Sequence, residues 1–169
     1  MNKPTDHSRR AFFGLRSHPA QPAAIRPPWS LEASLAAHCT HCGDCVAACP
    51  EKILRFDAAG LPEVDFGAGA CTFCGDCAKS CAVPVFDAAR TPAWHVEMLV
   101  SEQCLPKRGI LCESCRDVCI DGAIRFARST GQAPVPAIST TDCTGCGACI
   151  SVCPASAISA AWWEEATHA

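Results

Sequence analysis

The chain of 169 residues has few of the large apolar side chains that fill most protein cores. It contains no tyrosine, two methionines, four tryptophans and seven phenylalanines, and much of its 49% hydrophobic content is alanine and cysteine. A small domain with so thin a core usually needs disulfides or metal centres to stay folded. We therefore expect cross-links or inorganic groups to supply part of the stability of this fold.

Motifs of membrane proteins and of enzymes are also missing. No apolar stretch approaches the roughly 20 residues that a membrane-spanning helix needs, so no membrane span is expected. The chain has no nucleotide-binding glycine loop, no Ser-His-Asp set and no carboxylate pair with a catalytic rationale. These absences predict that the protein is not an enzyme with a substrate pocket.

Charge is distributed unevenly along the chain. Residues 1–30 include five basic residues and one acidic residue, a net charge of +4. The remainder has nine basic and sixteen acidic residues, a net charge of −7. Because an acidic body repels nucleic acids and favours partners with basic faces, we expect protein partners and no nucleic acid.

All 16 cysteines fall into four tight runs related to the pattern CxxCxxCxxxCP. The runs recur at intervals of similar length, which indicates a fourfold repeat of one structural unit. The third run has a longer first gap, and no proline directly follows the last cysteine of the second and third runs. The runs are Cys39, Cys42, Cys45 and Cys49; Cys71, Cys74, Cys77 and Cys81; Cys104, Cys112, Cys115 and Cys119; and Cys143, Cys146, Cys149 and Cys153.

This spacing favours iron–sulfur clusters over disulfides and zinc. Disulfide frameworks spread their cysteines among loops of secreted proteins, and no cleavable secretory signal is expected here. Structural zinc sites separate two CxxC pairs by a dozen or more residues. Three cysteines at steps of three suit one face of an iron–sulfur cube, and the fourth can bind a second cube. We therefore predict four [4Fe-4S] clusters in a reducing compartment.

The way the runs pair decides which cysteines share a cluster. Hairpins with glycine turns join the first run to the second and the third to the fourth, which favours tandem pairing. A nested pairing, of the first run with the fourth and the second with the third, is the alternative. Tandem pairing with crosswise ligation predicts these ligand sets: Cys39, Cys42, Cys45 and Cys81; Cys49, Cys71, Cys74 and Cys77; Cys104, Cys112, Cys115 and Cys153; Cys119, Cys143, Cys146 and Cys149.

Short strands are expected between the runs. Residues 53–56 and 61–66 are predicted to form one hairpin, and residues 124–127 and 135–138 a second one around Ser129–Gly131. The alternating apolar side chains of residues 94–100 predict one face of a further strand. The predicted fold class is α+β: tandem ferredoxin-like modules at residues 31–90 and 91–169, with short helices and two-stranded hairpins.

Residues near the cysteines are expected to shield and tune the clusters. Small residues such as Gly75 and Gly147 let backbone amides approach the cluster sulfurs. His38 and His41 are interpreted as surface groups, because each cube already has four cysteines. The side chains expected to pack over the clusters are Ile53, Leu54, Ile124 and Ile158.

The long gap of the third run carries the basic pair Lys107 and Arg108. We hypothesise that these charges tune the potential of the third cluster or make it more labile.

Residues 1–30 are predicted to form a flexible, basic arm, because five prolines interrupt any helix and no apolar periodicity is present. At its end, Arg26 to Trp29 is interpreted as a rigid entry to the first module. The segment from Ser8 to Leu15 looks like a twin-arginine export motif, but Arg16 and Pro19 cut the following apolar run short, so export is not expected. One interpretation of the arm is a disordered tail. The other is a docking segment for a partner, in which Arg9 and Arg10 steer and Phe12 and Phe13 anchor.

The Arg-rich start, the segment from Arg26 to Trp29, and the spacing from Cys104 to Cys112 together resemble the NapF-type ferredoxins of the periplasmic nitrate reductase system. The resemblance covers essentially the whole chain. It implies a cytoplasmic protein with four [4Fe-4S] clusters that binds the catalytic subunit of periplasmic nitrate reductase before export and helps to load or reduce its iron–sulfur centre.

Three functions from different classes are therefore considered. The first is maturation of that reductase, the second is general electron transfer between redox partners, and the third is a purely structural role for the clusters. Four clusters in 169 residues exceed what stapling a small fold requires, which counts against the third function.

Overall fold

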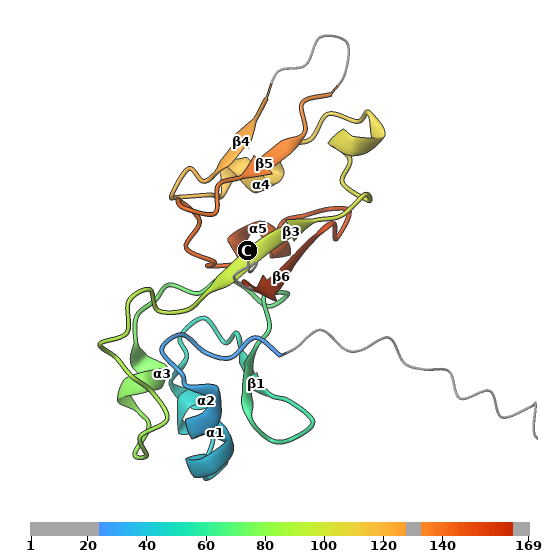
Figure 1. The fold of residues 1–169 in the computed structure, drawn as a ribbon. Coiled ribbons are helices and arrows are strands. Elements are labelled where there is room, and N and C mark those ends of the chain that lie inside the picture. The colour runs from blue at the N-terminus through green and yellow to red at the C-terminus, as the bar shows by residue number, and fades with distance from the viewer. Residues whose placement is uncertain (1–23, 128–132, 164–169) are drawn as a thin grey trace, which may run out of the picture.

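The computed structural model describes residues 24–127 and 133–163. These residues form short helices and three antiparallel pairs of strands, which agrees with the predicted α+β class. Figure 1 shows α1, α2, α3 and β1 at one end of the molecule, β4, β5 and α4 at the other, and β3, β6 and α5 between them. The helices are α1 (Glu32–His38), α2 (Asp44–Ala48), α3 (Asp76–Lys79), η2 (Pro106–Arg108), α4 (Ser114–Asp117) and α5 (Ala148–Ser151); the strands are β1 (Leu54–Phe56), β2 (Pro62–Val64), β3 (Val96–Val100), β4 (Ile124–Phe126), β5 (Pro136–Ile138) and β6 (Ile158–Trp162).

The structure contains strands at both predicted hairpins. β1 pairs with β2 so that Leu54 lies opposite Val64, and β4 pairs with β5 so that Ile124 lies opposite Ile138. The turn expected at Ser129–Gly131 lies outside the described residues. Local turn signals and apolar runs were therefore sufficient to predict these two pairs of strands.

β3 confirms the strand predicted from alternation. Trp94, Val96 and Met98 are buried, whereas Leu99 between two of the alternating positions is exposed. Its partner is β6, with Val96 opposite Trp162 and Val100 opposite Ile158. This long-range pairing was not predicted from the sequence. It joins residues 96–100 to residues 158–162, on either side of the third and fourth cysteine runs.

The third cysteine of each run lies on a short helix: α2, α3, α4 or α5. Three of these helices follow a glycine with a positive φ, namely Gly43 at 85°, Gly75 at 77° and Gly147 at 82°. Glycine adopts this left-handed conformation without the steric cost that a Cβ imposes. The repeated glycine therefore turns the cysteine loop into the helix, whereas α4 follows Glu113 at a φ of −134°.

Residues 25–30, at the end of the predicted arm, are packed into the fold, which agrees with the interpretation of Arg26 to Trp29 as a rigid entry to the first module. Ile25, Arg26 and Ser30 are buried, and the amide of Val64 donates to the carbonyl of Ile25 at 2.7 Å. The indole of Trp162 also donates to the carbonyl of Ala24, at 3.1 Å. Backbone pairing to β2 and contact with β6 thus order a segment that its prolines alone suggest to be loose.

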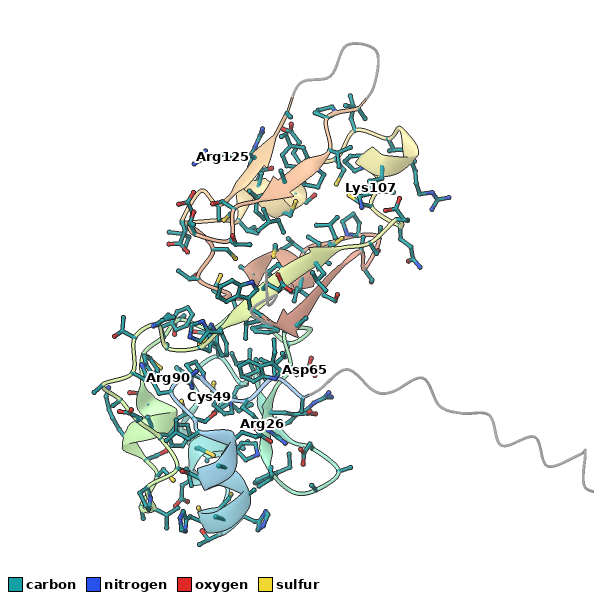
Figure 2. All side chains as sticks on the ribbon, viewed as in Figure 1. Arg26, Cys49, Asp65, Arg90, Lys107 and Arg125 are labelled. Atoms are coloured by element: carbon teal, nitrogen blue, oxygen red, sulfur yellow. The ribbon has the colours of Figure 1, made fainter. Side chains whose placement is uncertain are left out.

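Arg26 connects this segment to α1 and to the turn between β1 and β2. Its guanidinium donates to Glu32 at 3.0 Å, to Asp57 at 2.7 Å and to the carbonyl of Pro62 at 3.2 Å. Burial raises the pKa of Asp57, but hydrogen bonds from Arg26 and from two turn amides outweigh it and leave that pKa below its ordinary value. Figure 2 shows Arg26 in the part of the molecule that carries α1 and β1.

Replacing Arg26 with methionine is expected to lower the free energy of unfolding by about 2 kcal/mol, because it leaves Asp57 and the Pro62 carbonyl without their charged donor. Arg55→Met is the matched control. Arg55 pairs with Glu63 and Asp65 on the same hairpin, but 60% of its side chain is exposed, so its loss should cost about 0.5 kcal/mol. Denaturant unfolding of the iron-loaded protein measures the free energy of unfolding of both variants. Equal losses of free energy would contradict the idea that the burial of Arg26 makes its contacts the more stabilising ones.

Candidate metal centres

The cysteines surround four small cavities, and four cysteines line each one. Each group draws three cysteines from one run and one from its neighbour, the combination that tandem pairing with crosswise ligation predicts. The first set is Cys39, Cys42, Cys45 and Cys81; the second is Cys49, Cys71, Cys74 and Cys77; the third is Cys104, Cys112, Cys115 and Cys153; and the fourth is Cys119, Cys143, Cys146 and Cys149.

Electrostatics of the thiols reflect the same grouping. Burial, and to a smaller extent the nearby charge of Cys81, raises the pKa of Cys45 to about 11. Burial and a smaller contribution from Cys71 likewise raise the pKa of Cys77 to about 12. Buried thiols close to other thiols favour the protonated, neutral form. Four of them can therefore be deprotonated together at one cavity only when a positively charged group binds there.

The donor set fits an iron–sulfur cluster. Thiolates select soft metals, and four of them converge on each cavity. Within the described part of the chain, no group of three or more His, Cys, Asp or Glu side chains is arranged to hold a single metal ion. Cysteines spaced around a cavity in this way suit a cube of several metals and sulfides better than one tetrahedral zinc.

Apolar side chains surround the cavities as predicted. Ile53 and Leu54 line the cavity of the second set, Ile124 that of the fourth and Ile158 that of the third. All four are buried. They keep water from the sulfurs, which together with charge and hydrogen bonding sets the potential of an iron–sulfur centre.

Backbone amides approach the cysteine sulfurs in two sets. The amide of Phe73 donates to Sγ of Cys71 at 3.4 Å, and the amide of Ala157 donates to Sγ of Cys153 at 3.3 Å. Hydrogen bonds to ligand sulfurs stabilise the more reduced, more negative state of a cluster. Turn geometry after the cysteines therefore gives the chain a means of adjusting potential.

Lys107 is held by the loop that contains it. Its ammonium donates to the carbonyl of Val100 at 3.0 Å and to Glu102 at 2.8 Å. The pairing with Glu102 partly neutralises the charge that the sequence analysis expected to act on the third cluster, and it ties η2 to the end of β3. Figure 2 shows Lys107 at the opposite end of the molecule from Arg26.

The two histidines near the first set lie at the surface. His38 ends α1 and is exposed. The ring of His41 is within 2.7 Å of the carbonyl of Gly60, in the turn between β1 and β2. His41 therefore stabilises a turn beside the first set, consistent with the interpretation of both histidines as surface groups.

The second and fourth sets meet where the two halves of the chain pack together. The amide of Cys71 donates to the carbonyl of Cys146 at 2.8 Å. Within the second half, the indole of Trp94 donates to the carbonyl of Thr144 at 2.9 Å, and the Trp94 ring contacts Phe66 of the first half. The ring of Phe66 packs so closely on Gly147 that a Cβ there would lie 2.0 Å from it. We call this contact, made by Phe66, Cys71, Trp94 and residues 144–147, the seam.

A chain of aromatic rings extends from the seam into the first half. Trp29 contacts Phe73, Phe73 contacts Trp94, and Trp94 contacts Phe66, with ring centroids 6.3, 5.5 and 5.9 Å apart in edge-to-face geometry. A cavity of about 710 Å³ borders the rings of Trp29, Phe73 and Trp94 and reaches Cys143. The seam was not predicted from the sequence.

The residues predicted to dock a partner, Arg9, Arg10, Phe12 and Phe13, lie outside the described residues. Of the helices that the structure describes, none combines the length and the apolar character needed to cross a lipid bilayer.

Known proteins are similar to this one over most of the chain. The family model of the 4Fe-4S dicluster domain matches residues 38–85 and 109–157. The ferredoxin-type protein NapF of Haemophilus influenzae is 47% identical over 135 residues, which cover 79% of this chain and 77% of that protein. NapF of Escherichia coli (strain K12) is 37% identical over 156 residues, covering 92% and 94%. The methylamine utilization ferredoxin-type protein MauM of Methylophilus methylotrophus is 33% identical, covering 82% and 70%.

Proposed function

Because the chain belongs to the NapF family of ferredoxin-type iron–sulfur proteins, we propose that each of its four cysteine sets holds one [4Fe-4S] cluster. The observation that carries this proposal is the convergence of four cysteines on each of four cavities. When bound, such a cluster accepts and returns single electrons. The apolar residues around each cavity then exclude water, and the amides of Phe73 and Ala157 adjust the potential.

Chemical analysis of anaerobically prepared protein tests the cluster content. The expected result is about sixteen iron atoms and about sixteen acid-labile sulfides per chain, four of each for every set. Zinc in place of iron, or disulfides in place of thiolates, would contradict the proposal. About half of this iron and sulfide content would mean that two of the four cysteine sets are empty. Variants that lack the cysteines of one set at a time would identify the empty sets.

We further propose that the protein is cytoplasmic, is not an enzyme, and assists the catalytic subunit of periplasmic nitrate reductase before export. It would do so by supplying iron–sulfur units or electrons to that subunit. The high similarity to NapF proteins over most of the chain, and the basic start that resembles theirs, support this proposal. The alternative is general electron transfer, which the amide hydrogen bonds to the part-buried sulfurs of Cys71 and Cys153 support.

Cluster transfer separates these two functions. Iron-loaded protein labelled with ⁵⁷Fe is incubated anaerobically with cluster-free reductase, in oxidised and in reduced form, and the two proteins are separated. Labelled iron in the reductase is the expected result for a maturation protein that donates clusters. Retention of all label by the ferredoxin, with reduction of an already loaded reductase, would favour electron transfer.

The arm provides a test of the partner. Arg9→Ala combined with Arg10→Ala is expected to weaken binding of the reductase subunit about tenfold, because two steering charges of the docking segment are lost. Lys3→Ala combined with Arg16→Ala removes the same charge outside the arginine pair and should have a smaller effect. Binding is measured by calorimetry at fixed salt concentration. Equal affinity of the first variant and the unsubstituted protein would exclude the arginine pair from docking.

A further inference from the structure

The two halves of the chain meet through the second and fourth cysteine sets. At the seam the backbone of Cys71, from the second set, is hydrogen-bonded directly to the backbone of Cys146, from the fourth, at 2.8 Å. Phe66 lies against Gly147, the residue that follows Cys146. A ligand loop of one half thus contacts a ligand loop of the other with no intervening segment.

Within each half, helix packing brings the remaining sets alongside. α2, which carries Cys45 of the first set, packs against α3, which carries Cys77 of the second. α4 and α5, which carry Cys115 of the third set and Cys149 of the fourth, pack against each other in the same way.

We propose that the seam joins the four sets into a single electron path in the order first, second, fourth, third. This inference rests on the proposed function, because it requires the sets to be loaded. An electron that a one-electron donor delivers to one end lowers the oxidation state of one centre. The electron would then move to the next centre, which is reduced as the previous one is reoxidised. At the other end of the path, a one-electron acceptor would take the electron.

The seam suits this role because its contacts fix the separation of two ligand loops. Phe66 and Trp94 are 5% and 4% exposed, and the hydrogen bond from Trp94 to Thr144 holds the fourth loop against β3. A buried apolar contact resists water, so the passage of charge across it requires little rearrangement of solvent. Without the seam, the protein would be two separate pairs of centres on one chain.

Electron paramagnetic resonance of variants that lack one centre tests this order. Cys143→Ser with Cys149→Ser removes the fourth centre, and Cys104→Ser with Cys112→Ser removes the third. Both proteins are reduced anaerobically with dithionite, so that each remaining centre carries an unpaired spin, and neighbouring spins broaden one another's signals. In the proposed order, loss of the fourth centre leaves the third without a neighbour, and a narrow, isolated signal appears. Loss of the third leaves three centres in contact, and no isolated signal appears.

An isolated signal in the variant without the third centre would overturn the proposal, because the fourth would then have no neighbour across the seam. Absence of an isolated signal in the variant without the fourth centre would equally overturn the order. If either variant fails to fold, Gly147→Ala in the otherwise complete protein replaces it. The expected result is weaker magnetic coupling between centres of the two halves, so that their resonance signals saturate at lower microwave power. Unchanged saturation in a variant that retains four centres would contradict the role of the seam.

Iron and sulfide are counted in every sample before the spectra are interpreted. Fewer than four centres in the unsubstituted protein would count against the proposed function itself. Four centres together with spectra of two independent pairs would leave the proposed function standing and reject only the path through the seam.

Discussion

Removal of iron is expected to unfold this protein rather than merely to empty its sites. Five of the buried core residues are themselves cysteines of the sets: Cys49, Cys77, Cys104, Cys115 and Cys149. The helices have three to seven residues and the strands three to five, lengths that are marginal in water without tertiary support. Binding of a structural metal can contribute about 10 kcal/mol to folding, more than so small a core supplies.

Far-UV circular dichroism during anaerobic treatment with an iron chelator and a reductant measures this effect. Secondary structure should be lost in parallel with iron, and a sample with reductant but no chelator should keep both. A native-like spectrum after complete loss of iron would show that the apolar contacts suffice on their own. In that case the proposal that clusters replace a conventional core would be wrong.

Gly147→Ala is expected to destabilise the iron-loaded protein by about 3 kcal/mol. Two costs contribute. The residue has a φ of 82°, where a Cβ costs about 1 kcal/mol, and the ring of Phe66 occupies the space that the methyl group would need. Overpacking of this kind costs about 1–3 kcal/mol, because the ring or the loop of the fourth set must move.

Gly109→Ala provides a control with the same backbone conformation. Gly109 has a φ of 80° but nothing within 4 Å of a Cβ, so only the conformational cost of about 1 kcal/mol applies. Anaerobic denaturation followed by loss of cluster absorbance compares the two variants. Equal destabilisation would mean that Phe66 gives way easily and that the packing across the seam contributes little.

Elements that depend on neighbouring residues could be predicted from the sequence. Alternating apolar residues identified β3, and turn residues between short apolar runs identified β1 and β2 as well as β4 and β5. The pairing of β3 with β6 could not be predicted, because a strand's periodicity tells which face is buried but not which distant strand lies beside it. α1 was also missed, although Leu31, Leu35 and the alanines of that segment are a recognisable helical pattern.

The ligand residues of the candidate centres were evident from cysteine spacing, because three donors at short intervals need no long-range information to converge. The grouping of these cysteines around four cavities depends on the contacts of α2 with α3 and of α4 with α5. Cysteine spacing suggests this grouping but does not determine those helix contacts. The seam could not be predicted at all. It depends on Phe66 meeting Gly147, and nothing in either local sequence indicates the other.

The hydrogen bond from Trp162 to Ala24 has a consequence for biosynthesis. It joins residues 138 positions apart, so it can form only when nearly the whole described chain has left the ribosome. Chains emerge at roughly 5–20 residues per second, and domains that emerge first fold first. The contacts of the seam likewise need residues 144–147, so Phe66 and Cys71 stay uncovered for seconds after they emerge.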